Sequence, residues 1–393
     1  MPEGGPGAPL TVLQVLLIVV LVVFGSINTI AAKWVDRLTD NEGREFNHPF
    51  VQGVVMFIGQ SLCLVPFFIS YLYRKYYNRN QDDHVDTYTR LDESEIEERP
   101  KRFNPLIFLP PTLCDILSTS IMYVGLNLTH ASTFQMLRGA EIVFTGLLSV
   151  AFLRSVLQGF KWAGMGLVTV GLIVVGVAEI VFGTDSKADV NGVITGDLLI
   201  IMSQVIVAIQ MVYEEQYLKK YDVPALLAVG LEGFFGMTIL SIAIIPMYYI
   251  YVPSTFSHNP LNRLEDVFDA FRQTGENHMI IVALSGTVIS MALFNFAGIS
   301  LTKELSATTR VVLDNGRTPL IWIVCLSLGW QAFVPLQVLG FTLLLLGMFV
   351  YNDVIIGPWI RKTVIPAMEK RGYSTSCCFT FYGLERQTLL IDE

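Results

Sequence analysis

The chain has 393 residues, of which 52% are hydrophobic and 15% are charged, and its formal net charge is −8. A soluble domain carries about 25% charged residues, so this composition excludes an ordinary soluble globular protein. The acidic balance also offers no basic surface for a nucleic acid, and much of the negative charge lies in one polar segment, Asp82–Glu98.

Long apolar runs along the chain predict membrane-spanning helices. About 20 apolar residues in a helix cross the hydrocarbon core, where a helix satisfies its own backbone hydrogen bonds. A signal peptide is the alternative for the first run, but that run is long and no basic residue precedes it. Pro110–Pro111 and Pro319 remove backbone donors and are expected to kink the third and ninth helices. In chain order the ten helices are expected at residues 9–32, 50–73, 104–126, 131–153, 159–181, 197–218, 226–251, 279–301, 306–328 and 335–356.

The basic residues predict how these helices are oriented. Lys and Arg are concentrated in the loop at 74–103, after the fourth and sixth helices, and in the tail at 357–393. Cytosolic loops of membrane proteins carry the excess of Lys and Arg. We therefore expect both termini, the acidic loop and the tail to face the cytosol.

The two halves of the chain match each other weakly and in register. Ala131–Thr133 matches Ala307–Thr309 at an offset of 176 residues. The same offset relates two glycines of the fifth helix to two of the tenth, Gly164 to Gly340 and Gly171 to Gly347. A constant offset over consecutive helices predicts an internal repeat of five helices.

A repeat with an odd number of helices enters the membrane from opposite sides in its two copies. Carriers use this inverted symmetry to open one site to either side in turn. The fold class we predict is therefore an all-α membrane protein with ten transmembrane helices in a 5+5 inverted repeat. The first repeat is expected at 1–182, the second at 183–356 and the cytosolic tail at 357–393.

Charged residues inside two predicted helices are the strongest candidates for a substrate site. A charge inside a bilayer costs about 2.5–3.5 kcal/mol on insertion scales, so it predicts a function. Arginines would hold an anionic group, and the carboxylates would hold an amine or a proton. The alternative is that the charges neutralise each other within each helix and only hold the bundle together. The candidates are Gln135, Arg138 and Glu141 in the fourth helix, and Arg310, Asp314 and Arg317 in the ninth.

Further polar residues at membrane depth are weaker candidates. Gln60, Asn28 and Asn295 are expected to line the substrate path, with packing through interhelical hydrogen bonds as the alternative. Asp115 and Glu232 are candidate proton carriers, with solvation at helix ends as the alternative.

No motif of a catalytic, metal or cofactor site occurs in the sequence. It holds neither a His-Glu-x-x-His zinc motif nor a Walker loop, and its five His show no clear ligand spacing. We therefore predict a protein that is not an enzyme and needs no cofactor. A small-molecule substrate would move by exchange, facilitated or ion-coupled transport rather than by ATP hydrolysis.

Two short patterns on the predicted cytosolic side resemble sorting signals. Glu385 stands four positions before the dileucine Leu389 and Leu390, and Tyr88 with Leu91 forms a tyrosine-based pattern. Clathrin adaptors read both kinds of signal, so they predict an endosomal or lysosomal membrane. A Golgi or plasma-membrane protein with an unstructured tail is the alternative.

The stretch Gly25–Trp34, together with the repeat and the helix count, resembles the drug/metabolite transporter superfamily. Asn47–Phe50, Thr133–Gly139 and Val312–Pro319 resemble solute carrier family 35, subfamily F, which is similar to the chloroquine-resistance-transporter-like proteins. The resemblance spans about residues 10–356. It implies a ten-helix inverted-repeat carrier with a lysosomal location, and the Golgi and the mitochondrion are alternatives.

The resemblance and the residues together predict a secondary transporter of small charged metabolites. Relatives in family 35 carry nucleotide sugars through a Gly-Ala-Leu-Asn-Lys stretch in the ninth helix, whereas this chain reads Val311–Arg317 there. That departure argues against nucleotide-sugar antiport in the Golgi, which stays an alternative. A second alternative is a non-transporting interaction protein that acts through its acidic loop and tail.

Overall fold

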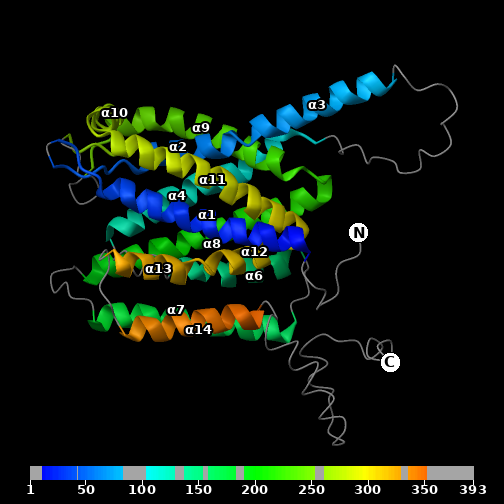
Figure 1. The fold of residues 1–393 in the computed structure, drawn as a ribbon. Coiled ribbons are helices and arrows are strands. Elements are labelled where there is room, and N and C mark those ends of the chain that lie inside the picture. The colour runs from blue at the N-terminus through cyan, green and yellow to red at the C-terminus, as the bar shows by residue number, and fades with distance from the viewer. Residues whose placement is uncertain are drawn as a thin grey trace, which may run out of the picture. The chain divides into compact units, whose positions relative to one another are not determined.

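The computed structural model is all-helical in the residues that it describes, which are 11–41, 43–82, 103–128, 137–153, 158–182, 190–252, 261–328 and 335–351. The helices of the first half, drawn in Figure 1, are α1 (Val12–Arg37), α2 (Pro49–Ser61), α3 (Leu64–Asp82), η1 (Pro105–Phe108), α4 (Leu109–Leu128), η2 (Arg138–Ala140), α6 (Glu141–Leu153) and α7 (Gly159–Phe182). Those of the second half are α8 (Val190–Tyr221), α9 (Ala225–Tyr249), α10 (Val267–Glu276), α11 (His278–Glu304), α12 (Ala307–Asn315), α13 (Thr318–Ser327) and α14 (Pro335–Tyr351).

Six helical stretches are long and apolar enough to cross a membrane, judged by length and composition. They are Val12–Arg37, Pro49–Tyr73, Pro105–Met122, Ile194–Tyr221, Ala225–Tyr249 and His278–Glu304, with shorter apolar helices at Gly159–Val174 and Val338–Tyr351. Each predicted apolar run forms helix over most of its described residues, so the prediction of an all-helical fold is confirmed. The short helix α10 was not predicted, because its ten residues carry no long apolar run.

Two predicted helices are each divided in two. The run at 50–73 breaks at Leu62–Cys63 between α2 and α3, and the run at 306–328 breaks at Gly316–Arg317 between α12 and α13. Pro66 and Pro319 lie just after these breaks, in the first turns of α3 and α13. A proline there removes the hydrogen bond that would have continued the preceding helix.

Pro110 and Pro111, for which a kink is predicted, lie in the first turn of α4, which follows directly on the short helix η1. The carbonyls of η1 stand one turn before them, and neither proline has an N–H to donate to these carbonyls. The prolines therefore lie where the 3-10 helix passes into the α-helix, and the kink itself stays a prediction.

The described residues form two compact units. Unit 1 draws on residues 1–22, 117–212 and 305–393, and unit 2 on residues 23–116 and 213–304. Each unit therefore combines segments from both halves of the sequence. In unit 1, the core side chains are Ile142, Met165, Val168, Leu172, Val311, Val312 and Tyr351.

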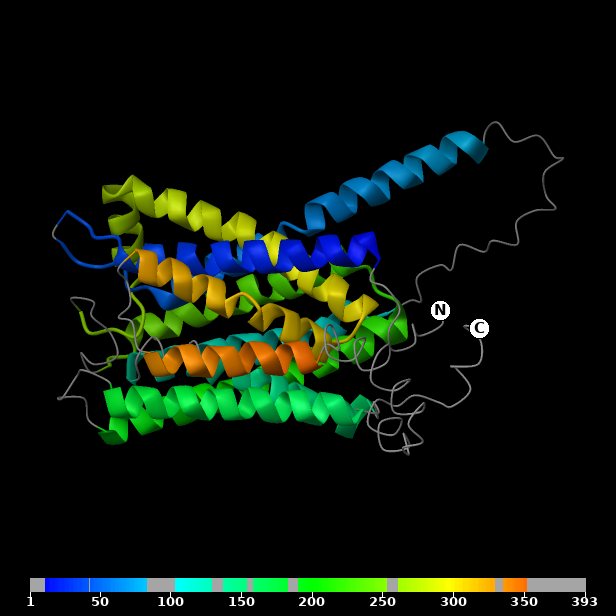
Figure 2. The ribbon, with the colours of Figure 1, turned by 60° about the horizontal axis from the view of Figure 1, so that its bottom comes forward.

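Helices α7 and α14 of unit 1 lie side by side along their length, as both views show (Figures 1 and 2). Glycines permit this close approach. A Cβ on Gly164 would lie 2.9 Å from the carbonyl oxygen of Gly347, and one on Gly171 would lie 3.0 Å from that of Gly340. Small residues that bring two backbones together are typical of helix pairs in membranes.

Helix α2 of unit 2 packs between α9 and α11. Gly233 of α9 lies against the backbone of Gln60 and Ser61, and a Cβ on Gly59 would lie 2.5 Å from the carbonyl oxygen of Val288 in α11. The Cys63 thiol, 3.6 Å from the carbonyl oxygen of Ala292, continues the α2–α11 contact.

Large apolar side chains stay exposed along the helices of both units. Ile69 of α3, Ile173 of α7, Ile245 of α9 and Ile289 of α11 each leave about 60% of their surface uncovered. Soluble proteins rarely expose apolar surface on this scale. Such helices are suited to contact with hydrocarbon.

Candidate functional site

The charged residues of the fourth and ninth predicted helices meet within unit 1. Arg138 lies in η2, Glu141 is the first residue of α6, and Arg310 and Asp314 lie in α12. Arg317 stands at the break before α13. The helix interruptions at η2 and at Gly316–Arg317 thus lie beside the charged side chains. An unbroken helix would instead have placed these side chains at regular angular steps around its axis.

Local contacts hold these elements together. The hydroxyls of Ser149 in α6 and Thr308 in α12 are 3.1 Å apart, and both side chains are buried. Gly139 of η2 lets α7 and α12 approach closely, because a Cβ there would lie 3.0 Å from Leu172 of α7 and 3.8 Å from the side-chain oxygen of Asn315 in α12. The Ser306 hydroxyl caps α12 by accepting a hydrogen bond from the Thr309 N–H at 3.1 Å.

The five charged side chains form one interacting cluster, which we call the unit 1 charge cluster. Arg317 donates from Nη2 to Asp314 Oδ2 at 2.9 Å, and Glu141 interacts electrostatically with both of these residues and with Arg138 and Arg310. Glu141, Arg310 and Arg317 are each only 6% exposed. The helices that carry the cluster, α6 and α12, also contribute Ile142, Val311 and Val312 to the core of unit 1.

Two carboxylate oxygens of the cluster lack a donor. Among the described residues, Glu141 Oε1 and Asp314 Oδ1 are buried and have no hydrogen-bond partner. A buried acceptor without a donor costs about 1–3 kcal/mol, and more when it is charged. Asp314 and Arg317 neutralise each other within one segment, as expected if the charges only hold the bundle together. Glu141 Oε1 and Asp314 Oδ1, however, lack a hydrogen-bond donor among the described residues.

The remaining membrane-depth candidates belong to unit 2. Asn28 is buried and accepts a hydrogen bond from the Ser290 hydroxyl of α11 at 3.4 Å. Asn295 donates from Nδ2 to the Met291 carbonyl, one turn back in its own helix, at 3.1 Å. The Asn28 contact is the interhelical packing bond that the alternative expects, whereas the Asn295 bond stays within α11. Gln60 and Glu232 are buried, in α2 and α9, and Asp115 of α4 is half-buried.

Several predicted residues lie outside the described part of the chain. They are Gln135 of the candidate site and the sorting-signal residues Tyr88, Leu91, Glu385, Leu389 and Leu390, together with the acidic stretch at 83–102 and the tail at 357–393. Their roles stay predictions.

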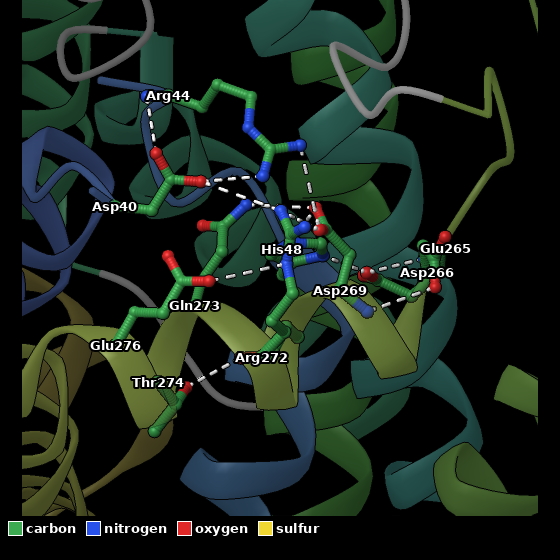
Figure 3. A network of polar contacts seen from close by, with 11 residues as sticks. Asp40, Arg44, His48, Glu265, Asp266, Asp269, Arg272, Gln273, Thr274 and Glu276 are labelled. Atoms are coloured by element: carbon green, nitrogen blue, oxygen red, sulfur yellow. Dashed lines mark hydrogen bonds and ion pairs between the residues drawn. The ribbon is translucent and has the colours of Figure 1, made fainter. Parts of the chain in front are cut away.

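A second polar network, in unit 2, was not anticipated from the sequence (Figure 3). His48, which precedes α2, is 2% exposed, and its Nδ1 lies 2.7 Å from Glu265 Oε1. Glu265 is 1% exposed and accepts two backbone N–H groups, from Phe50 at 2.9 Å and from Asp266 at 3.1 Å. The network therefore joins the segment before α2 to the segment before α10.

Ion pairs extend this network to the loop after α1 (Figure 3). Arg44 pairs with Asp40 at 2.7 Å, and Asp269 of α10 accepts from Arg272 at 3.1 Å and lies 3.7 Å from Arg44. No group of three or more His, Cys, Asp or Glu arranged for a metal occurs among the described residues. The contacts join the loop before α2 to the segment that begins α10, and we call this network the clamp.

Sequence reasoning missed this clamp for a physical reason. His48 and Glu265 are 217 positions apart, and charged residues in loops usually face water. The one available signal was His48 directly before Pro49, because proline favours the first turn of a helix and so places the histidine at a helix start.

Comparison with known proteins gives concordant matches. A family described as nucleotide-sugar transporter matches residues 10–246. The chain is 51% identical to Solute carrier family 35 member F6 of Rattus norvegicus and to the protein of the same name in Homo sapiens, in each case over 346 residues that cover 87% of this chain and 89% of the relative. An uncharacterized protein of Schizosaccharomyces pombe is 29% identical over 345 residues, which cover 87% of this chain and 98% of that protein.

Among solved structures, one titled "Crystal structure of protein" matches with a TM-score of 0.55 and 13% identity. The match covers 86% of this chain and 95% of that one. At this identity the likeness concerns the fold alone.

Proposed function

We propose that this chain, which belongs to the nucleotide-sugar transporter family and is therefore an integral membrane transporter, moves small charged metabolites by alternating access. Amino acids, peptides and organic anions are the classes that fit its charges. The observation that carries the proposal is the unit 1 charge cluster, because ionisable groups buried inside a membrane protein mark substrate and ion pathways.

The helix packing supports a ten-helix inverted repeat as the frame of this carrier. If α1, α2–α3, α4, η2–α6 and α7 form the first repeat, the second consists of α8, α9, α11, α12–α13 and α14. Within the units, α2 packs on α9, α6 on α12, and α7 on α14. Each of these pairs joins a helix to its own equivalent five positions later.

The direction of these pairs is the one that an inverted repeat requires. In the α2–α9 pair, Phe57 meets Gly236 while Ser61 meets Gly233, so the numbering rises along one helix and falls along the other. A shift by five helices reverses the chain direction, so equivalent helices of an inverted repeat are antiparallel.

The glycines of α7 and α14 give the same result with matched residues. Gly164 meets Gly347, and Gly171 meets Gly340. Under the offset of 176, Gly164 is equivalent to Gly340 and Gly171 is equivalent to Gly347. Each glycine of α7 therefore meets the equivalent of the other glycine, which is the reciprocal pattern of a two-fold axis. This reciprocity supports repeats at 1–182 and 183–356.

The roles in the site follow from the chemistry of its groups. Arg138, Arg310 and Arg317 hold an anionic group, because guanidinium presents a forked and permanently charged donor array. Glu141 and Asp314 supply the acceptors. The spacing of Gln135 from Arg138 in the sequence makes it a further proposed substrate contact. For unit 2 by itself, we propose that Gln60, Asn28 and Asn295 contact substrate and that Asp115 and Glu232 carry protons.

The proposed location is an endosomal or lysosomal membrane. It is supported by the two cytosolic patterns around Tyr88 and Leu389, which clathrin adaptors would read. Replacing Leu389 and Leu390 by alanine and imaging the protein in cells tests it. Unchanged colocalisation with lysosomal markers would refute the role of this signal.

Transport is tested with the purified protein in liposomes. Uptake of a radiolabelled metabolite panel, measured with and without a pH gradient, is expected to reveal at least one substrate. Arg317→Ala should abolish that flux, whereas Arg37→Ala, at the exposed end of α1, should leave it unchanged. The absence of any flux, or equal flux in wild type and Arg317→Ala, would refute the proposal.

Nucleotide-sugar transport is the second candidate, favoured by the family match over residues 10–246. The same liposomes, preloaded with a nucleoside monophosphate, distinguish the two. Exchange of labelled nucleotide sugar at rates above those of every small metabolite would replace our proposal by this one.

A further inference from the structure

Helix α10 lies in the chain between two helices of unit 2 that are long and apolar enough to cross a membrane. The first of them, α9, ends at Tyr249, and the second, α11, begins at His278, directly after α10 (Figure 1). The segment before α10 returns to the end of α9, where the Leu264 N–H donates to the Ile250 carbonyl at 2.9 Å. The helix α10 is therefore held beside the end of α9, where a helix that crosses the membrane reaches its surface.

The two sides of α10 differ in what they contact. Ala270 and Gln273 are each 2% exposed, and Ala270 belongs to a core cluster of unit 2. Phe268 and Phe271 are 73% and 71% exposed, and their spacing of three residues places both rings on the other side of the helix. Gly275 is exposed as well. One side of α10 is thus packed on the protein, whereas the other presents two large apolar rings to its surroundings.

These two rings continue an aromatic surface at the end of α9. Phe268 contacts Tyr248 edge to face, with ring centroids 5.4 Å apart. Tyr249 and Tyr251, which follow, are 72% and 74% exposed. We call Tyr249, Tyr251, Phe268 and Phe271 the aromatic patch. Tyrosine is enriched where membrane meets water, because its ring is apolar and its hydroxyl is polar.

The aromatic patch is continuous with an apolar stripe on α9. Ile242 and Ile245 are each 62% exposed and stand seven and four positions before Tyr249, so the three side chains lie on one face of the helix. In a helix that crosses a membrane, an exposed stripe of this kind contacts hydrocarbon. Because the stripe leads into the patch, the lipid that covers the stripe also reaches the patch.

We infer that α10 is an interfacial anchor whose aromatic patch is seated in phospholipid, at the boundary between head groups and acyl chains. Helices with one apolar side bind this boundary, and anionic lipids strengthen the binding when the helix is basic. The helix α10 and its cap carry three acids, Asp266, Asp269 and Glu276, against the single Arg272. The rings therefore supply the attachment, without help from the charge of the lipid.

The seat in the membrane has a structural consequence for unit 2. Asp269 and Arg272 of α10 carry ion pairs of the clamp, so a lipid-seated α10 fixes the clamp at the membrane surface. This interaction surface lies outside the unit 1 charge cluster, and the inference does not depend on what the carrier moves.

Nitroxide labels on α10 test the seat directly. The full-length chain keeps the buried Cys63 and has its other four cysteines replaced by serine. Phe268→Cys, Phe271→Cys and Gly275→Cys are then introduced one at a time, labelled, and reconstituted in phosphatidylcholine nanodiscs. Collisions of each label with oxygen, which concentrates in lipid, are compared with collisions with a water-soluble nickel complex.

Two positions on α11 calibrate this comparison. Ile289→Cys, at an exposed residue within the helix, is the hydrocarbon reference, and Glu304→Cys, at its exposed end, is the water reference. We expect the oxygen-to-nickel collision ratio on α10 to exceed the Glu304 value by about threefold or more and to stay below the Ile289 value, because the boundary lies between hydrocarbon and water. A Cβ on Gly275 meets open space, so this position decides the matter even if a phenylalanine variant fails to fold.

Three results would overturn the inference. A ratio equal to that of the water reference would mean that the aromatic patch faces water. Weak collisions with both reagents would mean that protein, such as a second copy of this chain, covers the patch. The same ratio is expected in nanodiscs that contain phosphatidylglycerol, and a seat that forms only with this anionic lipid would mean that charge rather than the rings holds α10.

Discussion

The clamp around Glu265 offers a sharp test of what stabilises unit 2. Glu265→Ala removes a carboxylate that is 1% exposed and accepts three hydrogen bonds, from His48, Phe50 and Asp266. Alanine satisfies none of them, so one buried imidazole and two backbone N–H groups lose their acceptor. Breaking a buried pair from one side costs about 3–5 kcal/mol.

This cost converts into a large thermal shift. One kcal/mol moves Tm by about 2–4 °C in a domain of 150–250 residues, so Glu265→Ala should lower Tm by about 10 °C. With the other four cysteines replaced by serine, a thiol-reactive dye in detergent measures it, because Cys63 is buried until unit 2 unfolds. Glu265→Gln keeps one acceptor oxygen, so its Tm should fall less than that of Glu265→Ala.

A matched control shows whether the effect belongs to the clamp. Glu304 is an exposed glutamate at the end of α11, so Glu304→Ala should stay within about 0.5 kcal/mol of wild type. If the Tm of Glu265→Ala lies within about 2 °C of the Tm of Glu304→Ala, the energetic reasoning about buried acceptors is refuted. A double-mutant cycle with His48→Ala should show a coupling of about 0.5–3 kcal/mol, because the two side chains share one hydrogen bond.

Three further substitutions test separate features by the same melting assay. Gly164→Ala places a Cβ 2.8 Å from the backbone nitrogen of Tyr351 and should cost about 1–3 kcal/mol of stability. Its control, Gly166→Ala in the same helix, meets open space and should be neutral or stabilising. Equal Tm values for the two variants would contradict the close approach of α7 and α14. Asp266→Ala removes the side chain that caps α10 and should cost about 1 kcal/mol, and an unchanged Tm would show that the cap is not needed. Asp222→Asn breaks the ion pair with Lys303 and keeps a residue type that tolerates the φ of 49° at this position. The Asp222 side chain is 62% exposed, so a loss above about 1 kcal/mol would contradict the expected solvent screening.

Hydropathy alone determined where the helices lie. The run predicted at 226–251 is α9, Ala225–Tyr249, and the run predicted at 279–301 lies within α11, His278–Glu304. The reason is that a backbone in hydrocarbon must satisfy its own hydrogen bonds, which leaves a long apolar segment little choice but a helix. The spacing of charges was equally informative, because residues three or four apart in a helix share a face and so Asp314 meets Arg317.

Tertiary structure decided what no local pattern encodes. It divided the helices at Leu62–Cys63 and Gly316–Arg317, formed the bond between His48 and Glu265, and left Glu141 Oε1 without a donor among the residues that the structure describes. Each of these depends on which distant segment packs beside the residue, and burial and hydrogen bonding are properties of the neighbours as much as of the side chain itself.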